Sequence, residues 1–201
     1  MALSNDGRKL YVAVTGPTPD SYIAVFDAST LERLTTIQNI GCPMSLFTTS
    51  SKPYLFVATQ CGDPGDLLYV IDTRDDRVVK HIAGFAVGSR VVASPDGKKV
   101  FVLSLDRISI VTKWHSANPS IRQFRIAATS LAISRDGGLL LLGTEHGIVS
   151  MDARRDRVCQ RVRLAALTAR PREMAFTPDG WVYADLPDGL FLNHRKALEC
   201  R

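Results

Sequence analysis

One short turn recurs along this chain and sets a repeat length. Ser94-Pro95-Asp96-Gly97 joins two apolar stretches, similar tetrapeptides begin at Ser4, Ser134 and Thr177, and a degraded copy begins at Thr49. Successive copies lie 40 to 45 residues apart. Glycine tolerates the positive φ of a tight turn and aspartate bonds to its own backbone, so each copy predicts a β-hairpin. A period of this length is typical of proteins built from stacked repeats.

A second landmark keeps the same period. An apolar stretch in each repeat ends in a polar residue, and these residues are Asp27, Asp72, Thr112, Asp152 and Asn193. Each repeat therefore predicts three apolar strands and a more polar outer strand, which in the fifth repeat is expected at Ala197–Cys200. Four-stranded sheets packed around an axis make a β-propeller. We predict an all-β fold, a single β-propeller domain over 1–201, with five four-stranded blades at about 1–40, 41–85, 86–126, 127–167 and 168–201.

Two arrangements of these blades stay open at this point. The five blades would form a closed ring, or an arc of a larger propeller, for example one with seven blades. An arc would expose two apolar sheet faces, and another chain or segment would have to cover them.

Several stretches match the pattern of a known repeat. They are Ser-Pro-Asp-Gly-Lys-Lys-Val-Phe-Val at 94–102, Tyr-Val-Ile-Asp-Thr at 69–73, Leu-Tyr-Val-Ala-Val at 10–14 and Gly-Cys-Pro at 41–43. These stretches resemble the YVTN family of β-propeller repeats, and the resemblance covers essentially the whole chain. Thr112 departs from the family pattern, which has aspartate there. The resemblance implies a propeller, often exported in bacteria and archaea, and no single activity.

Charge and hydropathy limit the kinds of partner that the chain is expected to have. The chain of 201 residues has 25 basic and 20 acidic residues, spread without blocks of like charge. This pattern favours a solvated surface over a nucleic-acid partner. No apolar run is long enough to span a membrane, and the start of the chain predicts no signal peptide. A periplasmic or extracellular location is favoured by the resemblance, with a cytoplasmic one as the alternative.

Propellers bind ligands on the face formed by the loops between second and third strands. Here those loops carry Asp63, Asp66, Glu145 and His146. The acids predict either a rim that binds a cation or a basic ligand, or ordinary turn residues. Their spacing is not that of a calcium site.

Arginines at the starts of inner strands form a second candidate set: Arg90, Arg170 and Arg172. At the mouth of a central channel they would bind an anion or a phosphate, unless they form salt bridges with the rim acids. The histidines have no metal-ligand spacing and accompany no nucleophile motif, so we predict no metal, no cofactor and no catalytic residue.

These features indicate a non-catalytic binding or scaffolding propeller that presents its loop face to a protein, a peptide or a small ligand. The alternative is enzymatic: a propeller subunit of an oxidoreductase, or a lyase or hydrolase that uses rim residues.

The four cysteines predict one disulfide. Cys42 and Cys61 lie across from each other in the hairpin of the second repeat, so we predict that they pair, as in an oxidising compartment. Cys159 and Cys200 occupy equivalent places on the outer strands of neighbouring blades. Because such places lie far apart, we predict that these two cysteines are free.

The two tryptophans receive opposite predictions. Trp181 begins an inner hairpin strand, which indicates a core position. Trp114 stands beside a proline-containing insertion, which indicates an exposed contact residue.

Overall fold

The computed structural model describes residues 1–16, 20–60, 66–85, 88–104, 106–163, 171–186 and 189–200, with the backbone alone at 66, 67, 88 and 89. This part of the chain forms β-strands and one short 3-10 helix. It divides into two compact units. The first comprises Met1–Leu105 with Ser109–Gln123, and the second Asp106–Ile108 with Phe124–Arg201.

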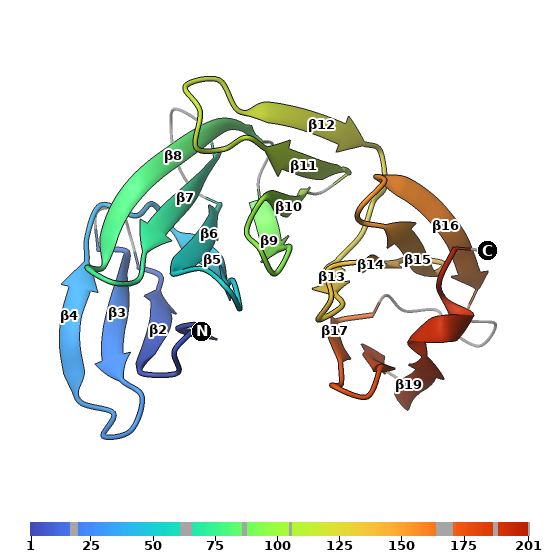
Figure 1. Ribbon diagram of the computed structural model, residues 1–201, viewed down its shortest axis with the longest axis horizontal. Helices are drawn as coiled ribbons and strands as arrows, with labels where there is room; N and C mark the ends of the chain where they lie inside the picture. The colour runs from blue at the N-terminus through green and yellow to red at the C-terminus, as the bar shows by residue number, and fades with distance from the viewer. Residues whose placement is uncertain are drawn as a thin grey trace. The chain divides into compact units, whose positions relative to one another are not determined.

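The first unit holds three sheets, each with four strands in chain order. Figure 1 draws the first sheet in blue, with β2, β3 and β4 side by side. The strands are β1 (Ala2–Leu3), β2 (Lys9–Val14), β3 (Tyr22–Asp27), β4 (Arg33–Ile37), β5 (Pro43–Thr48), β6 (Tyr54–Thr59), β7 (Asp66–Asp72), β8 (Arg77–Phe85), β9 (Gly88–Ala93), β10 (Lys99–Ser104), β11 (Ile108–Thr112) and β12 (Ser120–Phe124).

The second unit holds a four-stranded and a three-stranded sheet. Their strands are β13 (Ser130–Ile133), β14 (Leu139–Thr144), β15 (Gly147–Asp152), β16 (Arg157–Arg163), β17 (Glu173–Phe176), β18 (Trp181–Leu186) and β19 (Gly189–His194), followed by the 3-10 helix η1 (Arg195–Ala197). The all-β fold predicted from the sequence is confirmed, and four of the five sheets have the predicted four strands.

The Asp-Gly turns share one set of hydrogen bonds. In the third repeat, Ser94 Oγ donates to Asp96 Oδ1 at 2.7 Å and accepts from the backbone N–H of Lys99 at 3.0 Å. Gly97 has φ of +68°, which a residue with a side chain rarely adopts. Ser4, Ser134 and Thr177 begin turns with the same serine- or threonine-to-aspartate bond. The repeated sequence therefore forms a repeated local structure, which joins the first strand of each of these sheets to the second.

Apolar side chains on the inner strands fill the space between neighbouring sheets of a unit. One cluster joins the first two sheets, a second joins the second and third, and a third joins the fourth and fifth. Burial of each large side chain contributes about 1.5–3 kcal/mol. The outer strands β4 and β12 are mostly exposed, as their polar sequences predict.

The predicted outer strand of the fifth repeat, Ala197–Cys200, is wrong. The chain leaves β19 in η1, whose first turn is capped by His194 Nδ1 accepting from Lys196 N. Leu198 then turns inward and is fully buried among residues of the fourth and fifth sheets. Burial of this leucine favours a path back toward the fourth sheet over a fourth strand.

Both tryptophan predictions are also wrong. Trp114 is 2% exposed, and its Nε1–H donates to the backbone oxygen of Gly97 at 2.7 Å. Its ring meets those of Tyr54 and Phe56 edge-on, at centroid distances of 5.0 and 5.6 Å. The turn after β11 thus directs an aromatic side chain between the second and third sheets. Trp181 is 39% exposed, because it lies on the flank of the fifth sheet that faces away from the fourth.

Candidate functional site

A cleft of about 380 Å³ lies at the β14–β15 turn in the second unit. Glu145 and His146 occupy this two-residue turn, and both side chains are exposed. The turn closes because Thr144 pairs with Gly147, whose backbone oxygen accepts a hydrogen bond from Thr144 Oγ1 at 2.9 Å. This turn is one of the loops between second and third strands that the sequence analysis predicts to form the binding face.

Arginines from two other segments line the same cleft. Arg161 and Arg163 lie two residues apart on β16, opposite Val149 and Gly147 of β15, so both side chains project from one face of the sheet. Arg125 joins them from the connection between β12 and β13. Buried residues, including Ile126 and Val149, form the apolar part of the wall.

The charge of this cleft is unbalanced toward positive. Among the described residues that line it, three guanidinium groups and one imidazole accompany a single carboxylate, that of Glu145. Asp106 lies near enough to Arg125 for their charges to interact. The pKa of Asp106 is lowered chiefly by the hydrogen bond from Arg107 and only slightly by Arg125. Guanidinium groups donate in pairs to carboxylates and phosphates, so this arrangement is suited to an anionic group.

Among the other candidates from the sequence, Arg90 and Arg172 are described by the structure and are not among the residues that line this cleft. Arg90 lies on β9 opposite Leu103, in the first unit. Arg172 is exposed, and its backbone N–H donates to Asp185 O at 2.9 Å. Asp66 begins β7, where only the backbone is described. Arg170 and Asp63 lie outside the described residues.

Sequence reasoning missed three residues of the cleft: Arg125, Arg161 and Arg163. A signal was present for two of them, since arginines two residues apart on a strand share a face. That face could not be assigned to a loop without the register of β15 against β16. In the described cleft the carboxylate of Glu145 is outnumbered by basic side chains. The acidic rim across the other loops stays a prediction.

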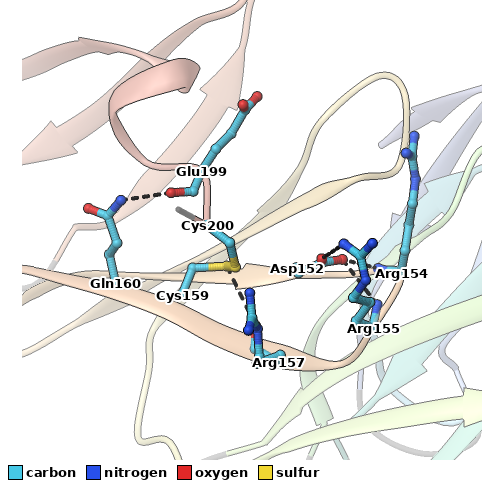
Figure 2. The surroundings of a disulfide bond; sticks show 8 residues. All are labelled: Asp152, Arg154, Arg155, Arg157, Cys159, Gln160, Glu199 and Cys200. Carbon is cyan, nitrogen blue, oxygen red and sulfur yellow. Dashed lines mark hydrogen bonds and ion pairs between the residues drawn. A yellow bond between two sulfur atoms is a disulfide. The ribbon is translucent and has the colours of Figure 1, made fainter.

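A second cleft of about 380 Å³ surrounds a disulfide bond between Cys159 and Cys200. Figure 2 shows the bond joining β16 to the segment after η1, with Gln160 donating to the backbone oxygen of Glu199. The prediction that both cysteines are free is therefore wrong. Cys200 is not on an outer strand, and the return of the chain brings its Cα to 4.6 Å from that of Cys159.

The charges around this disulfide are compensated. Arg195 donates to both carboxylate oxygens of Asp136, at 3.2 and 3.1 Å, and to Glu199 Oε1 at 2.9 Å. Partial burial alone would raise the pKa of Asp136, but hydrogen bonds from Arg195, Ser134 and the N–H of Gly138 outweigh it and hold that pKa well below its usual range. These contacts fasten η1 to the turn of the fourth sheet, which indicates a structural role.

The structure describes only one cysteine of the other predicted disulfide, Cys42–Cys61. Cys42 is disulfide-bonded, and the N–H of Gln60 donates to its backbone oxygen at 3.1 Å. Cys61 lies outside the described residues, so its pairing with Cys42 stays a prediction. Peptide mapping under non-reducing conditions would test it.

Neither a metal site nor a membrane helix is found in the described parts of the chain. Their histidine, cysteine and acidic side chains form no group of three that would hold a metal ion. They also contain no helix of the length and hydropathy that crossing a bilayer requires.

Comparison with known proteins establishes the fold and no family. No protein-family model matches the chain, and no curated protein matches it. Among solved structures, Kuenenia stuttgartiensis hydrazine synthase matches with a TM-score of 0.78 and 18% identity, over 96% of this chain and 70% of that one. The β-propeller domain of Myceliophteria thermophila Cps50 (Swd1) matches with a TM-score of 0.74 and 16% identity, over 92% of this chain and 61% of that one.

The chain thus spans about three fifths to seven tenths of the length of these structures. Likeness at such low identity shows the fold alone. Together with the repeated four-stranded sheets, it shows that this chain has the β-propeller fold, and the sheets are called blades 1 to 5 below, in chain order.

Proposed function

We propose that this chain is a non-catalytic binding or scaffolding propeller, and that blade 4 holds an anionic group of its ligand. The observation that supports this most directly is the cleft beside His146, where Arg125, Arg161 and Arg163 converge. A concave site with a few convergent polar groups and an apolar wall is the usual form of a ligand site. A carboxylate or a phosphate on a small molecule or a peptide is the matching chemistry.

Each group has a distinct part in this proposal. Arg161 and Arg163 project from one strand face and would form a fork for two oxygens of the anion. Arg125 would contact the anion from the connection between β12 and β13, and His146 would donate a hydrogen bond from the turn. Ile126 and Val149 would pack against the apolar part of the ligand.

Further features expected from the sequence join the proposal. We propose that the repeats are of the YVTN type, that the two units belong to one propeller domain, that Arg172 adds contacts for a larger ligand, and that Arg90 contacts an anion within its own unit. Hydrazine synthase shares the fold of this chain, but an identity of 18% gives no argument for an activity.

The proposal is tested by titration calorimetry with three probes: inorganic phosphate, citrate and a hexaglutamate peptide. At least one probe is expected to bind, and its affinity should fall as the salt concentration rises. Replacing both Arg161 and Arg163 by glutamine should weaken that binding about 10- to 100-fold, because hydrogen bonds to charged groups are lost.

Arg157→Gln is the matched control. Arg157 lies on the same strand with an exposed side chain, and it does not line the cleft. Its replacement removes one positive charge from the strand and should leave the affinity within about twofold of the original. An equal loss in the control and in the double variant would mean that net charge alone attracts the probe. Failure of all three probes to bind would refute the proposal.

A further inference from the structure

The arginines of the cleft beside His146 are left without carboxylate partners in the described part of the chain. The side chains of Arg161 and Arg163 form no hydrogen bond and no ion pair with any residue that the structure describes. Arg125 has only its weak electrostatic interaction with Asp106. Like charges that are held together repel one another, so such a group is stabilised when an anion binds to it.

The other cleft of blade 4 shows that the chain pairs its arginines elsewhere. Around the Cys159–Cys200 disulfide, three arginines each contact a carboxylate, at N–O distances of 2.9 to 3.5 Å. The pairs are Arg154–Asp136, Arg155–Asp152, which Figure 2 shows, and Arg195–Asp136. The two clefts have similar volumes, and they differ in whether the protein itself supplies the counter-charge.

The number of arginines distinguishes between the two anions that suit the cleft. A guanidinium group can donate to two acceptor positions at once. A carboxylate has two oxygens with about four acceptor sites, so two arginines satisfy it. A phosphate monoester has three terminal oxygens and a charge of about −1.5 to −2 at pH 7. With three arginines in the cleft, the phosphate monoester is the anion that gives each arginine a partner.

The strand register makes a shared contact with one phosphate feasible. Arg161 and Arg163 pair with Val149 and Gly147, so they share a face of β16 about 6–7 Å apart along the strand. Their side chains are long enough to meet at a single group between them. Val149 and the neighbouring Ile126 line the same cleft and are buried, so they offer an apolar surface to the organic part of the ester.

We infer that the anionic group bound in this cleft is a phosphate monoester on a small apolar body, such as an aromatic ring, and that the three arginines bind its three terminal oxygens. This inference rests on the proposed function, because an anion must bind in the cleft, and it commits to one chemical class. Every residue that carries it belongs to the second unit.

Three aryl anions test the inference by titration calorimetry: phenyl phosphate, phenyl sulfate and benzoate. Phenyl sulfate has the three terminal oxygens of the phosphate but a single charge, and benzoate has two oxygens. At pH 7.5, phenyl phosphate should bind about tenfold more tightly than either, because charged hydrogen bonds are added. The ratio of phosphate to sulfate affinity should fall at least about fivefold at pH 5, since the ester loses its second charge near pH 6. Titration of His146 or Glu145 affects both probes and largely cancels in this ratio.

Arg125→Gln assigns the third arginine. It should weaken phenyl phosphate at least about fivefold more than it weakens benzoate, because the carboxylate is already satisfied by the arginines of β16. Arg157→Gln is again the matched control and should weaken neither probe by more than about twofold. Circular dichroism checks that both variants are folded.

The outcomes separate this inference from the proposed function. Benzoate that binds as tightly as phenyl phosphate, with both lost when Arg161 and Arg163 are replaced by glutamine, would overturn the inference and leave the anion site in place. Failure of every anion to bind would overturn both. A pentapeptide with a central phosphotyrosine identifies the source of the ester. Tighter binding than phenyl phosphate indicates a phosphopeptide, equal or weaker binding indicates a free ester, and either result supports the phosphate monoester.

Discussion

Replacement of Trp114 by alanine tests the packing between blades 2 and 3. The side chain is 2% exposed, contacts the rings of Tyr54 and Phe56, and donates a hydrogen bond to the backbone oxygen of Gly97. Truncation of a buried aromatic side chain costs about 3–5 kcal/mol, and the Gly97 carbonyl would lose its indole donor. For a chain of this size the melting temperature should fall by about 6–20 °C. Trp114→Phe keeps part of the packing and should give an intermediate loss.

Fluorescence gives an independent assay of the same side chain. The chain has two tryptophans, so Trp181→Phe leaves Trp114 as the single fluorophore. Its emission should be that of a buried indole, shielded from acrylamide and shifted to the red on unfolding. Trp181→Phe by itself should cost less than about 1 kcal/mol, because that side chain is 39% exposed. The reasoning is refuted if acrylamide quenches Trp114 as readily as an exposed tryptophan, or if Trp114→Ala has the same melting temperature as the unmodified protein.

Three further perturbations have defined outcomes. Cys200→Ser removes the disulfide bond between two cysteines 41 residues apart in sequence. Because this bond restrains the unfolded chain, its loss should lower the free energy of unfolding by about 4 kcal/mol. Calorimetry should show the melting temperature falling by about 8–16 °C. Asp136→Asn should lower the melting temperature above about pH 4, because the folded protein stabilises the charged carboxylate of Asp136, as its lowered pKa indicates. In melting curves recorded from neutral to acidic pH, the difference in melting temperature between this variant and the unmodified protein should shrink as the pH falls. Gly143→Ala should destabilise markedly in urea unfolding, since the added carbon would overlap Ser130 Oγ; full stability would contradict the close approach.

The candidate site was partly predictable because its turn is local. Glu145 and His146 fall between two strands whose lengths follow from the hairpin signals, so the sequence could place them on the loop face. Arg125, Arg161 and Arg163 come from two further segments, and their convergence depends on strand register and on the path between blades. Side-chain periodicity assigns a residue to a face of its own strand, but it does not say what lies opposite that face.

The repeat itself was determined by the sequence alone. The Asp-Gly turn forms from contacts between residues at most five apart, such as those of Ser94 with Asp96 and Lys99. It can therefore be predicted from the local sequence. Burial of Trp114 and the disulfide of Cys200 were decided only by the tertiary structure. In both, a segment without strand periodicity turns toward a neighbouring sheet because apolar burial is available there, and that opportunity exists only once the sheets are packed together.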